Sequence, residues 1–293
     1  MGRDLAAEFP AAAEVFERAD MILNRKLSEI AWNGPLEELT KTANCQPALY
    51  VHGLASLAAL RSVAGEFEIE AAAGLSLGEW TAHAAAETFD FSTGLKLVEK
   101  RGQLMEAACA ATAGAMAAMI GAEEGAVRTL AADSDVDIAN LNAPGQVVIS
   151  GEAAKVEMAV SMAREHGIRR ATLLNVAGAY HSRLMNSAYL ELGEALLTAE
   201  LCTARFPVVS NVSGTPADGL PEIRRTLQDQ VTGTVRWVDC MEWLLDRGCD
   251  LFLELGPGGV LTGLLQRIRK GVEVMSVTDP ATLQACAARI RST

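Results

Sequence analysis

The feature that most constrains the backbone of this chain is the stretch "AAAGLSLGEW" at residues 71–80. A run of small and apolar residues ends at Gly74-Leu75-Ser76-Leu77-Gly78, and an acidic amphipathic segment follows. A strand that ends in Gly-x-Ser-x-Gly and continues as a helix forms a nucleophile elbow, which holds the serine in a tight, strained turn. We expect Gly74 and Gly78 to remove Cβ atoms that would clash with the strand and the helix. The stretch therefore predicts a nucleophile at Ser76, with a purely structural turn as the alternative.

The helix that follows the serine also predicts how negative charge would be stabilised there. The first turn of a helix has free N–H groups and the positive end of the helix dipole, and both favour a developing oxyanion. The backbone N–H of Leu77, next to Ser76, is the expected first oxyanion donor.

A serine nucleophile needs a base, and the chain has four histidines. His83 lies seven residues after Ser76 on the same predicted helix, about 10 Å along its axis, which is too far to reach the hydroxyl. His52 lies inside an apolar helix, and His166 lies near a helix end, where a histidine commonly contacts the last carbonyls. His181, in a predicted loop, is therefore the candidate base by elimination.

Composition excludes several classes of function. With 25 basic and 37 acidic residues the formal net charge is −12, which argues against non-specific binding to nucleic acid or to an anionic membrane. Six cysteines have neither CxxC nor zinc-site spacing, so we expect reduced thiols and no metal. No segment resembles a membrane span or a secretory signal, so we expect a cytoplasmic protein, or one in a plastid-like compartment.

Helical and strand patterns alternate along most of the chain, which predicts an α/β fold. Outside residues 112–178, helices are expected near 11–24, 46–64, 77–87, 92–110, 183–200, 221–230, 238–247 and 259–269. Pro47 is placed in the first turn of its helix, where proline is tolerated. Strands are expected at 68–73, 206–211, 251–255 and 273–277. Strands separated by helices predict a mostly parallel sheet covered on both faces.

Residues 112–178 have a different pattern, in which short strands are more frequent. Four short strand patterns, "AMAAMIG", "VDIANLN", "QVVISG" and "RRATLLNV", are interleaved with helices near 122–132 and 152–166. The order β-α-β-β-α-β is ferredoxin-like. We therefore predict a ferredoxin-like subdomain at 112–178, inserted into a large α/β-hydrolase-like domain made of residues 1–111 and 179–293.

Six motifs in order carry a resemblance that covers nearly the whole chain. They are "GLSLGEW", "LVEKRGQLM", "GAMAAMIG", "NLNAPGQVVISG", "GAYHSRLM" and "LELGPGGVLTGLL". Together they resemble the malonyl-CoA:acyl-carrier-protein transacylases, which load malonyl units for fatty-acid synthesis and have relatives in polyketide synthases.

The resemblance implies a ping-pong transfer without a cofactor, with malonyl-CoA and an acyl-carrier protein as partners. Ser76 would attack the malonyl thioester, and His181 would accept its proton and later activate the phosphopantetheine thiol. The main-chain carbonyl of Gln230 would orient His181, and Arg101 would bind the malonyl carboxylate. Without the resemblance, Arg101 would read as a surface residue of an amphipathic helix.

The chain departs from the family pattern at two places. Leu75 stands where many relatives have histidine, although some plastid-type members have leucine there. In the family a strand and a GQGSQ-like loop, whose glutamine supplies a second oxyanion N–H, precede residues resembling "MGRDLAAEFP", with which this sequence starts. We therefore expect a misplaced start or a fragment of a longer protein.

Other interpretations stay open at this point. Arg169, Arg170, Arg183 and the "RIRK" group at 267–270 are candidate docking cations for an acidic carrier protein, or ordinary solvated charges. An α/β-type serine hydrolase or thioesterase shares the elbow, but its histidine normally follows an acidic triad member near the end of the chain. A catalytically impaired acyltransferase-like module that still binds carrier protein is the third alternative.

Overall fold

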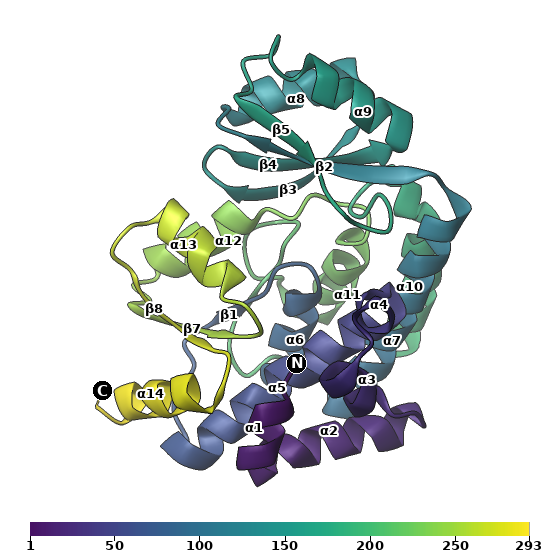
Figure 1. The fold of residues 1–293 in the computed structure, drawn as a ribbon. Coiled ribbons are helices and arrows are strands. Elements are labelled where there is room, and N and C mark those ends of the chain that lie inside the picture. The colour runs from purple at the N-terminus through teal and green to yellow at the C-terminus, as the bar shows by residue number, and fades with distance from the viewer. Residues whose placement is uncertain (293) are drawn as a thin grey trace. The chain divides into compact units, whose positions relative to one another are not determined.

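The computed structural model describes residues 1–292 and has the α/β composition expected from the sequence. These residues form two compact units. The first contains Met1–Gly102, Glu200–Val208 and Leu244–Thr293, and the second contains Gln103–Ala199 and Val209–Trp243. Figure 1 shows the elements of both.

The first unit is mainly helical. Its helices are α1 (Arg3–Glu8), α2 (Pro10–Leu23), α3 (Leu27–Asn33), α4 (Leu36–Thr40), α5 (Thr42–Ala64), α6 (Leu77–Ala85), α13 (Val260–Ile268), α14 (Pro280–Arg291) and the first half of α7 (Phe91–Ala111). The long helices expected near 11–24, 46–64, 77–87 and 92–110 are all present. The short helices α1, α3 and α4, and the terminal α14, have no counterpart among the expected helices.

Helix α5 begins earlier than its sequence pattern predicts, so Pro47 lies in its second turn instead of its first. A proline there cannot donate a hydrogen bond to the carbonyl four residues earlier, which is that of Ala43. The side chain of Arg25 compensates, because its Nη2 donates to Ala43 O at 3.2 Å. The proline is thus tolerated inside the helix by a tertiary contact that the local sequence does not show.

The strands outside residues 114–173 are short. Strand β1 (Ala72–Ala73) pairs with β6 (Val208–Val209), and β7 (Leu251–Leu255) pairs in parallel with β8 (Glu273–Val277). The expected continuous, mostly parallel sheet is therefore replaced, among the described residues, by two separate pairs of strands. Of the predicted strand 68–73 only Ala72–Ala73 is a strand, because residues 66–71, although they alternate polar and apolar side chains, bury none of them and have no regular secondary structure.

The second unit is built around a four-stranded antiparallel sheet. Its order is β3-β4-β2-β5, from β2 (Gly114–Ile120), β3 (Asp137–Ala143), β4 (Gln146–Glu152) and β5 (Arg170–Leu173). Helices α8 (Glu124–Asp133) and α9 (Ala153–Met162) cover one face of it (Figure 1). The core between them is formed by buried aliphatic residues, including Met119, Leu130, Ile149 and Val156. All four strands and both helices were expected at these places from the sequence.

The remaining elements of the second unit follow the sheet in the chain. They are the 3₁₀-helix η1 (Arg183–Met185), α10 (Asn186–Thr198), α11 (Gly219–Asp229) and most of α12 (Trp237–Asp246). The segment before α12 joins the outer edge of β3: Val235 N donates to Ala139 O at 2.8 Å, and Leu141 N donates to Val235 O at 2.9 Å. Strand β3 is therefore bonded on both sides, to β4 and to this segment.

Candidate active site

Ser76 sits at the turn between β1 and α6 in a strained conformation. Its φ is 51° and its ψ is −103°, a region that non-glycine residues rarely occupy and that often marks a functional site. Gly74 is what permits the turn, because an added Cβ there would lie 1.9 Å from the backbone carbon of Gly78. The elbow geometry expected from "GLSLG" is thus present.

The second glycine has a different role from the expected one. A Cβ added to Gly78 would meet no heavy atom of the described residues within 4 Å outside its own helix backbone. The expectation that Gly78 avoids a clash through its own missing side chain is therefore wrong. The close approach is between Gly74 and the backbone of residue 78, so only the first glycine is sterically required.

Leu77 begins α6 directly after the serine. The first amides of a helix have no acceptor within the helix and point out from its N-terminus. The next two amides are used in the turn itself, since Gly78 N donates to Leu75 O and Glu79 N donates to Ser76 O. This arrangement is compatible with Leu77 N–H as an oxyanion donor.

Arg101 lies beside the serine within the first unit. Its guanidinium Nη2 is 3.0 Å from Ser76 Oγ, and its Nη1 donates to Gln46 Oε1 at 2.5 Å. The side chain is only 1% exposed, and its guanidinium carbon is 6.0 Å from the centre of the Trp80 ring. The alternative of a surface residue is therefore wrong. Gln46, which comes from α5, was not singled out from the sequence.

His181 and Gln230 come together in the second unit. The Nδ1 atom of His181 is 2.8 Å from the main-chain oxygen of Gln230. Because a carbonyl can only accept, Nδ1 carries the proton, and Nε2 of the neutral ring is left as the acceptor. Both residues are buried, and His181 itself has a positive φ of 55°. This is the contact that the resemblance implied.

The carbonyl partner of His181 is itself held in place. Gln230 N donates to Thr226 O at 2.9 Å, which fixes the peptide at the end of α11. The Gln230 side-chain Nε2 is 3.4 Å from Oδ1 of Asn211, another fully buried residue. Asn211 was not singled out from the sequence, because a lone asparagine in "SNVSG" has no recognisable spacing to His181.

The other three histidines occupy structural positions. His83 is buried in α6, its Nδ1 lies 2.9 Å from Thr88 Oγ1, and burial lowers its pKa to about 3. His52 is buried in α5, and burial lowers its pKa to about 4. His166 follows the end of α9, where its main-chain N–H donates to Met162 O at 3.4 Å, and its Nε2 lies 3.6 Å from a carboxylate oxygen of Asp133.

The structure offers no metal site and no membrane span within residues 1–292. No group of three or more His, Cys, Asp or Glu side chains in that range is placed to hold a metal ion. None of the helices in the same range combines the length and the apolar composition needed to cross a bilayer.

Comparison with known proteins identifies the family. The sequence matches the model of the acyl transferase domain over residues 1–283. The chain belongs to the acyl transferase family. It is 38% identical over 291 residues to the malonyl CoA-acyl carrier protein transacylase of Bacillus subtilis (strain 168), an alignment that covers 97% of this chain and 90% of that protein. A second B. subtilis relative, the polyketide biosynthesis malonyl CoA-acyl carrier protein transacylase PksC, is 41% identical over 94% of both chains.

Solved structures of this acyltransferase family agree closely with the fold. The acyl-carrier-protein-S-malonyltransferase from Bartonella henselae superposes with a TM-score of 0.94 at 39% identity, covering 99% of this chain and 94% of that one. A malonyl-transacylase in complex with its type II polyketide synthase acyl-carrier protein gives a TM-score of 0.93 at 36% identity, with the same coverage.

Proposed function

We propose that this acyltransferase moves a malonyl group from malonyl-CoA to the phosphopantetheine thiol of an acyl-carrier protein through a malonyl-Ser76 intermediate. The observation that carries the proposal is the placement of a buried arginine, Arg101, 3.0 Å from the hydroxyl of a strained elbow serine. A guanidinium at that distance is suited to a substrate that carries a carboxylate near its reacting carbonyl. The names of the relatives support the same substrate pair.

In the first half-reaction, Ser76 Oγ attacks the thioester carbonyl carbon of malonyl-CoA and its proton passes to Nε2 of His181. The Gln230 carbonyl keeps the other ring nitrogen protonated, so that Nε2 is the basic atom. The Leu77 N–H stabilises the oxyanion of the tetrahedral intermediate. When this intermediate collapses, the C–S bond breaks, and the coenzyme A sulfur leaves with the proton that His181 returns.

The second half-reaction reverses these steps with a different thiol. His181 Nε2 takes the proton of the phosphopantetheine thiol, whose sulfur attacks the malonyl ester carbon. The bond from that carbon to Ser76 Oγ breaks, and the serine recovers its proton from the imidazolium. Arg101 holds the malonyl carboxylate in both halves, and the chemistry uses no cofactor.

We also propose that residues 112–178 are a ferredoxin-like insertion in a large α/β-hydrolase-like domain formed by 1–111 and 179–293. The strand order β3-β4-β2-β5, with two helices on one face, supports the ferredoxin-like part. The positions of β1, the elbow and α6 support the hydrolase-like part. The compact unit that contains the sheet is larger than the proposed insertion and includes α10 and α11.

The test is a transfer assay with malonyl-CoA and an acyl-carrier protein that carries its phosphopantetheine arm. We expect malonyl-carrier protein to accumulate, and no product with the same carrier lacking the arm. A hydrolase would instead release free malonate and coenzyme A at a rate independent of the carrier. A catalytically impaired binding module would bind the carrier without forming a malonyl ester, and either result would contradict the proposal.

A further inference from the structure

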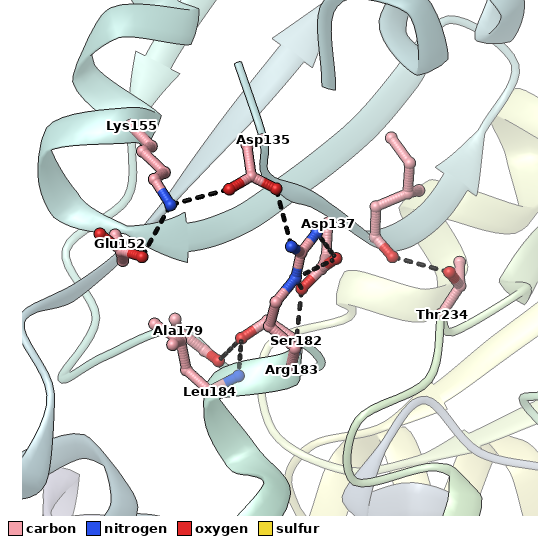
Figure 2. Close-up of polar contacts among 10 residues, drawn as sticks. Asp135, Asp137, Glu152, Lys155, Ala179, Ser182, Arg183, Leu184 and Thr234 are labelled. Carbon is pink, nitrogen blue, oxygen red and sulfur yellow. Dashed lines mark hydrogen bonds and ion pairs between the residues drawn. The ribbon is translucent and has the colours of Figure 1, made fainter. Parts of the chain in front are cut away.

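Arg183 lies two positions after His181, and the carboxylate of Asp137 on β3 binds it. The main-chain N–H of Arg183 donates to Asp137 Oδ2 at 2.8 Å. Its guanidinium donates hydrogen bonds to the same carboxylate, with Nε 3.1 Å from both oxygens and Nη2 2.8 Å from Oδ1 (Figure 2). One carboxylate therefore fixes both the backbone and the side chain of Arg183.

This clamp, formed by Asp137 and Arg183, is connected to three further charged residues. Arg183 Nη1 donates to Asp135 Oδ1 at 2.7 Å, and Lys155 Nζ bridges Asp135 to Glu152 at 2.8 Å from each (Figure 2). Hydrogen bonds from Lys155 and Arg183 lower the pKa of Asp135 below its usual value. The charge of Arg183 is thus compensated by Asp135 and Asp137 within its own unit.

The segment between the histidine and the clamp has little freedom. Ser182, which is fully buried, donates from Oγ to Ala179 O at 2.7 Å and accepts from Leu184 N at 3.2 Å. His181, directly before it, has the strained φ of 55°. A displacement of Arg183 would therefore be passed on through one rigid residue to His181.

Strand β3 also binds the segment that follows Gln230, the hydrogen-bond partner of His181. Thr234 Oγ1 donates to Ile138 O at 2.7 Å (Figure 2), and Val235 N donates to Ala139 O at 2.8 Å. Gln230 lies four residues before Thr234 in the same segment. The strand thus anchors two segments, one through Asp137 and one through the backbone of the next two residues.

We infer that Asp137 is a positioning residue for His181. By binding both segments, strand β3 sets the distance from the imidazole to the Gln230 carbonyl. The inference rests on the proposed role of His181 as the base. Asp137 touches neither substrate nor the reacting atoms, and it acts only through Arg183. The Arg183 side chain is 58% exposed and that of Asp137 is 24% exposed, so the ion pair contributes little to global stability.

The kinetic test compares Asp137→Ala, Asp137→Asn and Arg183→Ala with the matched control Glu152→Gln, which removes an ion pair of the same network without touching Arg183. We expect Asp137→Ala to slow single-turnover acylation of Ser76 by about tenfold or more, because small misplacements of a catalytic group are costly. The concentration of malonyl-CoA giving half-maximal rate and the melting temperature should change little. Asp137→Asn, which keeps an oxygen for the Arg183 N–H, should recover part of the rate.

A second readout does not depend on activity. With ¹⁵N-labelled histidine the chain gives resonances from only four rings, and His181→Ala assigns those of His181. We expect Asp137→Ala and Arg183→Ala to shift the His181 Nδ1 and Nε2 resonances toward those of a ring that has lost its carbonyl partner, and Glu152→Gln to leave them in place. If Asp137→Ala does not fold, Asp137→Asn and Arg183→Ala decide.

The outcomes separate the inference from the proposed function. Unchanged His181 resonances and acylation rates in folded clamp variants would overturn the inference, as would an equal loss in Glu152→Gln. An unmodified wild-type Ser76 would instead overturn the proposed function, while a ring shift in the clamp variants would still support the positioning of His181 by Asp137.

Discussion

Nη2 of Arg101 lies 3.0 Å from the hydroxyl oxygen of Ser76, and the two residues belong to the same compact unit. The arginine comes from the middle of α7 and the serine from the start of α6, so two separate elements define the distance between charge and nucleophile. A planar guanidinium presents five N–H donors in a fixed fork that matches the geometry of a carboxylate, and the Arg101 guanidinium lies next to both Ser76 and Gln46. This pair is the basis of the predicted acyl selectivity.

Replacing Arg101 with glutamine should remove that selectivity. We expect the rate of Ser76 acylation by malonyl-CoA to fall by about 10²-fold or more, because the carboxylate would be buried without its charged partner. Acylation by acetyl-CoA should fall much less, so the preference for malonyl over acetyl shrinks. This preference is measured by letting the two thioesters compete and quantifying the two acyl-enzymes by mass spectrometry. Lys100→Gln, one exposed residue earlier on α7, is the control. An unchanged preference in Arg101→Gln would exclude the assigned role.

The two glycines of the elbow should respond in opposite ways to alanine. Gly74→Ala would place a Cβ 1.9 Å from the backbone of residue 78, so the turn must open and the melting temperature should fall clearly. Gly78→Ala meets open space and replaces a poor helix former in α6, so we expect it to be neutral or stabilising, by up to about 1 kcal/mol. Thermal unfolding of the two variants measures this. Equal losses in both would show that the elbow geometry described here is incorrect.

Protonation of buried His83 predicts a pH dependence of stability. Burial lowers the pKa of His83 from 6.5 to about 3, so between these values the unfolded chain binds a proton that the folded chain does not. Stability is therefore complete above pH 6.5 and falls as the pH is lowered. Between about pH 8 and about pH 5 the wild type should lose about 2 kcal/mol more of its unfolding free energy than His83→Gln does. Urea titrations at both pH values measure the difference, and parallel losses would rule out a neutral buried His83.

The sequence predicted the fold well where periodicity is local. The four strands and two helices between 114 and 173 lie where their alternating and helical patterns indicate, because each buries one face against a nearby neighbour. Features that depend on contacts between residues distant in the chain could not be predicted from the sequence. The carbonyl of Ala43, which Pro47 leaves without its helical donor, accepts a hydrogen bond from the side chain of Arg25, which comes from the turn between α2 and α3. No local pattern shows such a contact.

In the candidate site, too, local sequence marks some residues, whereas others can be recognised only from their tertiary contacts. Ser76 is marked by its glycine spacing, and His181 could be chosen because only four histidines exist. Arg101 and Gln230 needed the family resemblance, because a burial of 1% or a main-chain hydrogen bond leaves no trace in residue spacing. Asp137 could not be found at all, since its contact with Arg183 spans 46 residues and joins two ordinary surface charges.

The proposed action of His181 as the base for Ser76 is the central claim, and the most direct test of it is time-resolved, peptide-resolved mass spectrometry after mixing with malonyl-CoA. We predict one malonyl group on the peptide containing Ser76 in the wild type and none in Ser76→Ala. His181→Ala should acquire it about 10²–10⁴-fold more slowly, the usual contribution of a general base. A malonyl group carried by another residue, or acylation of His181→Ala at the wild-type rate, would contradict the account.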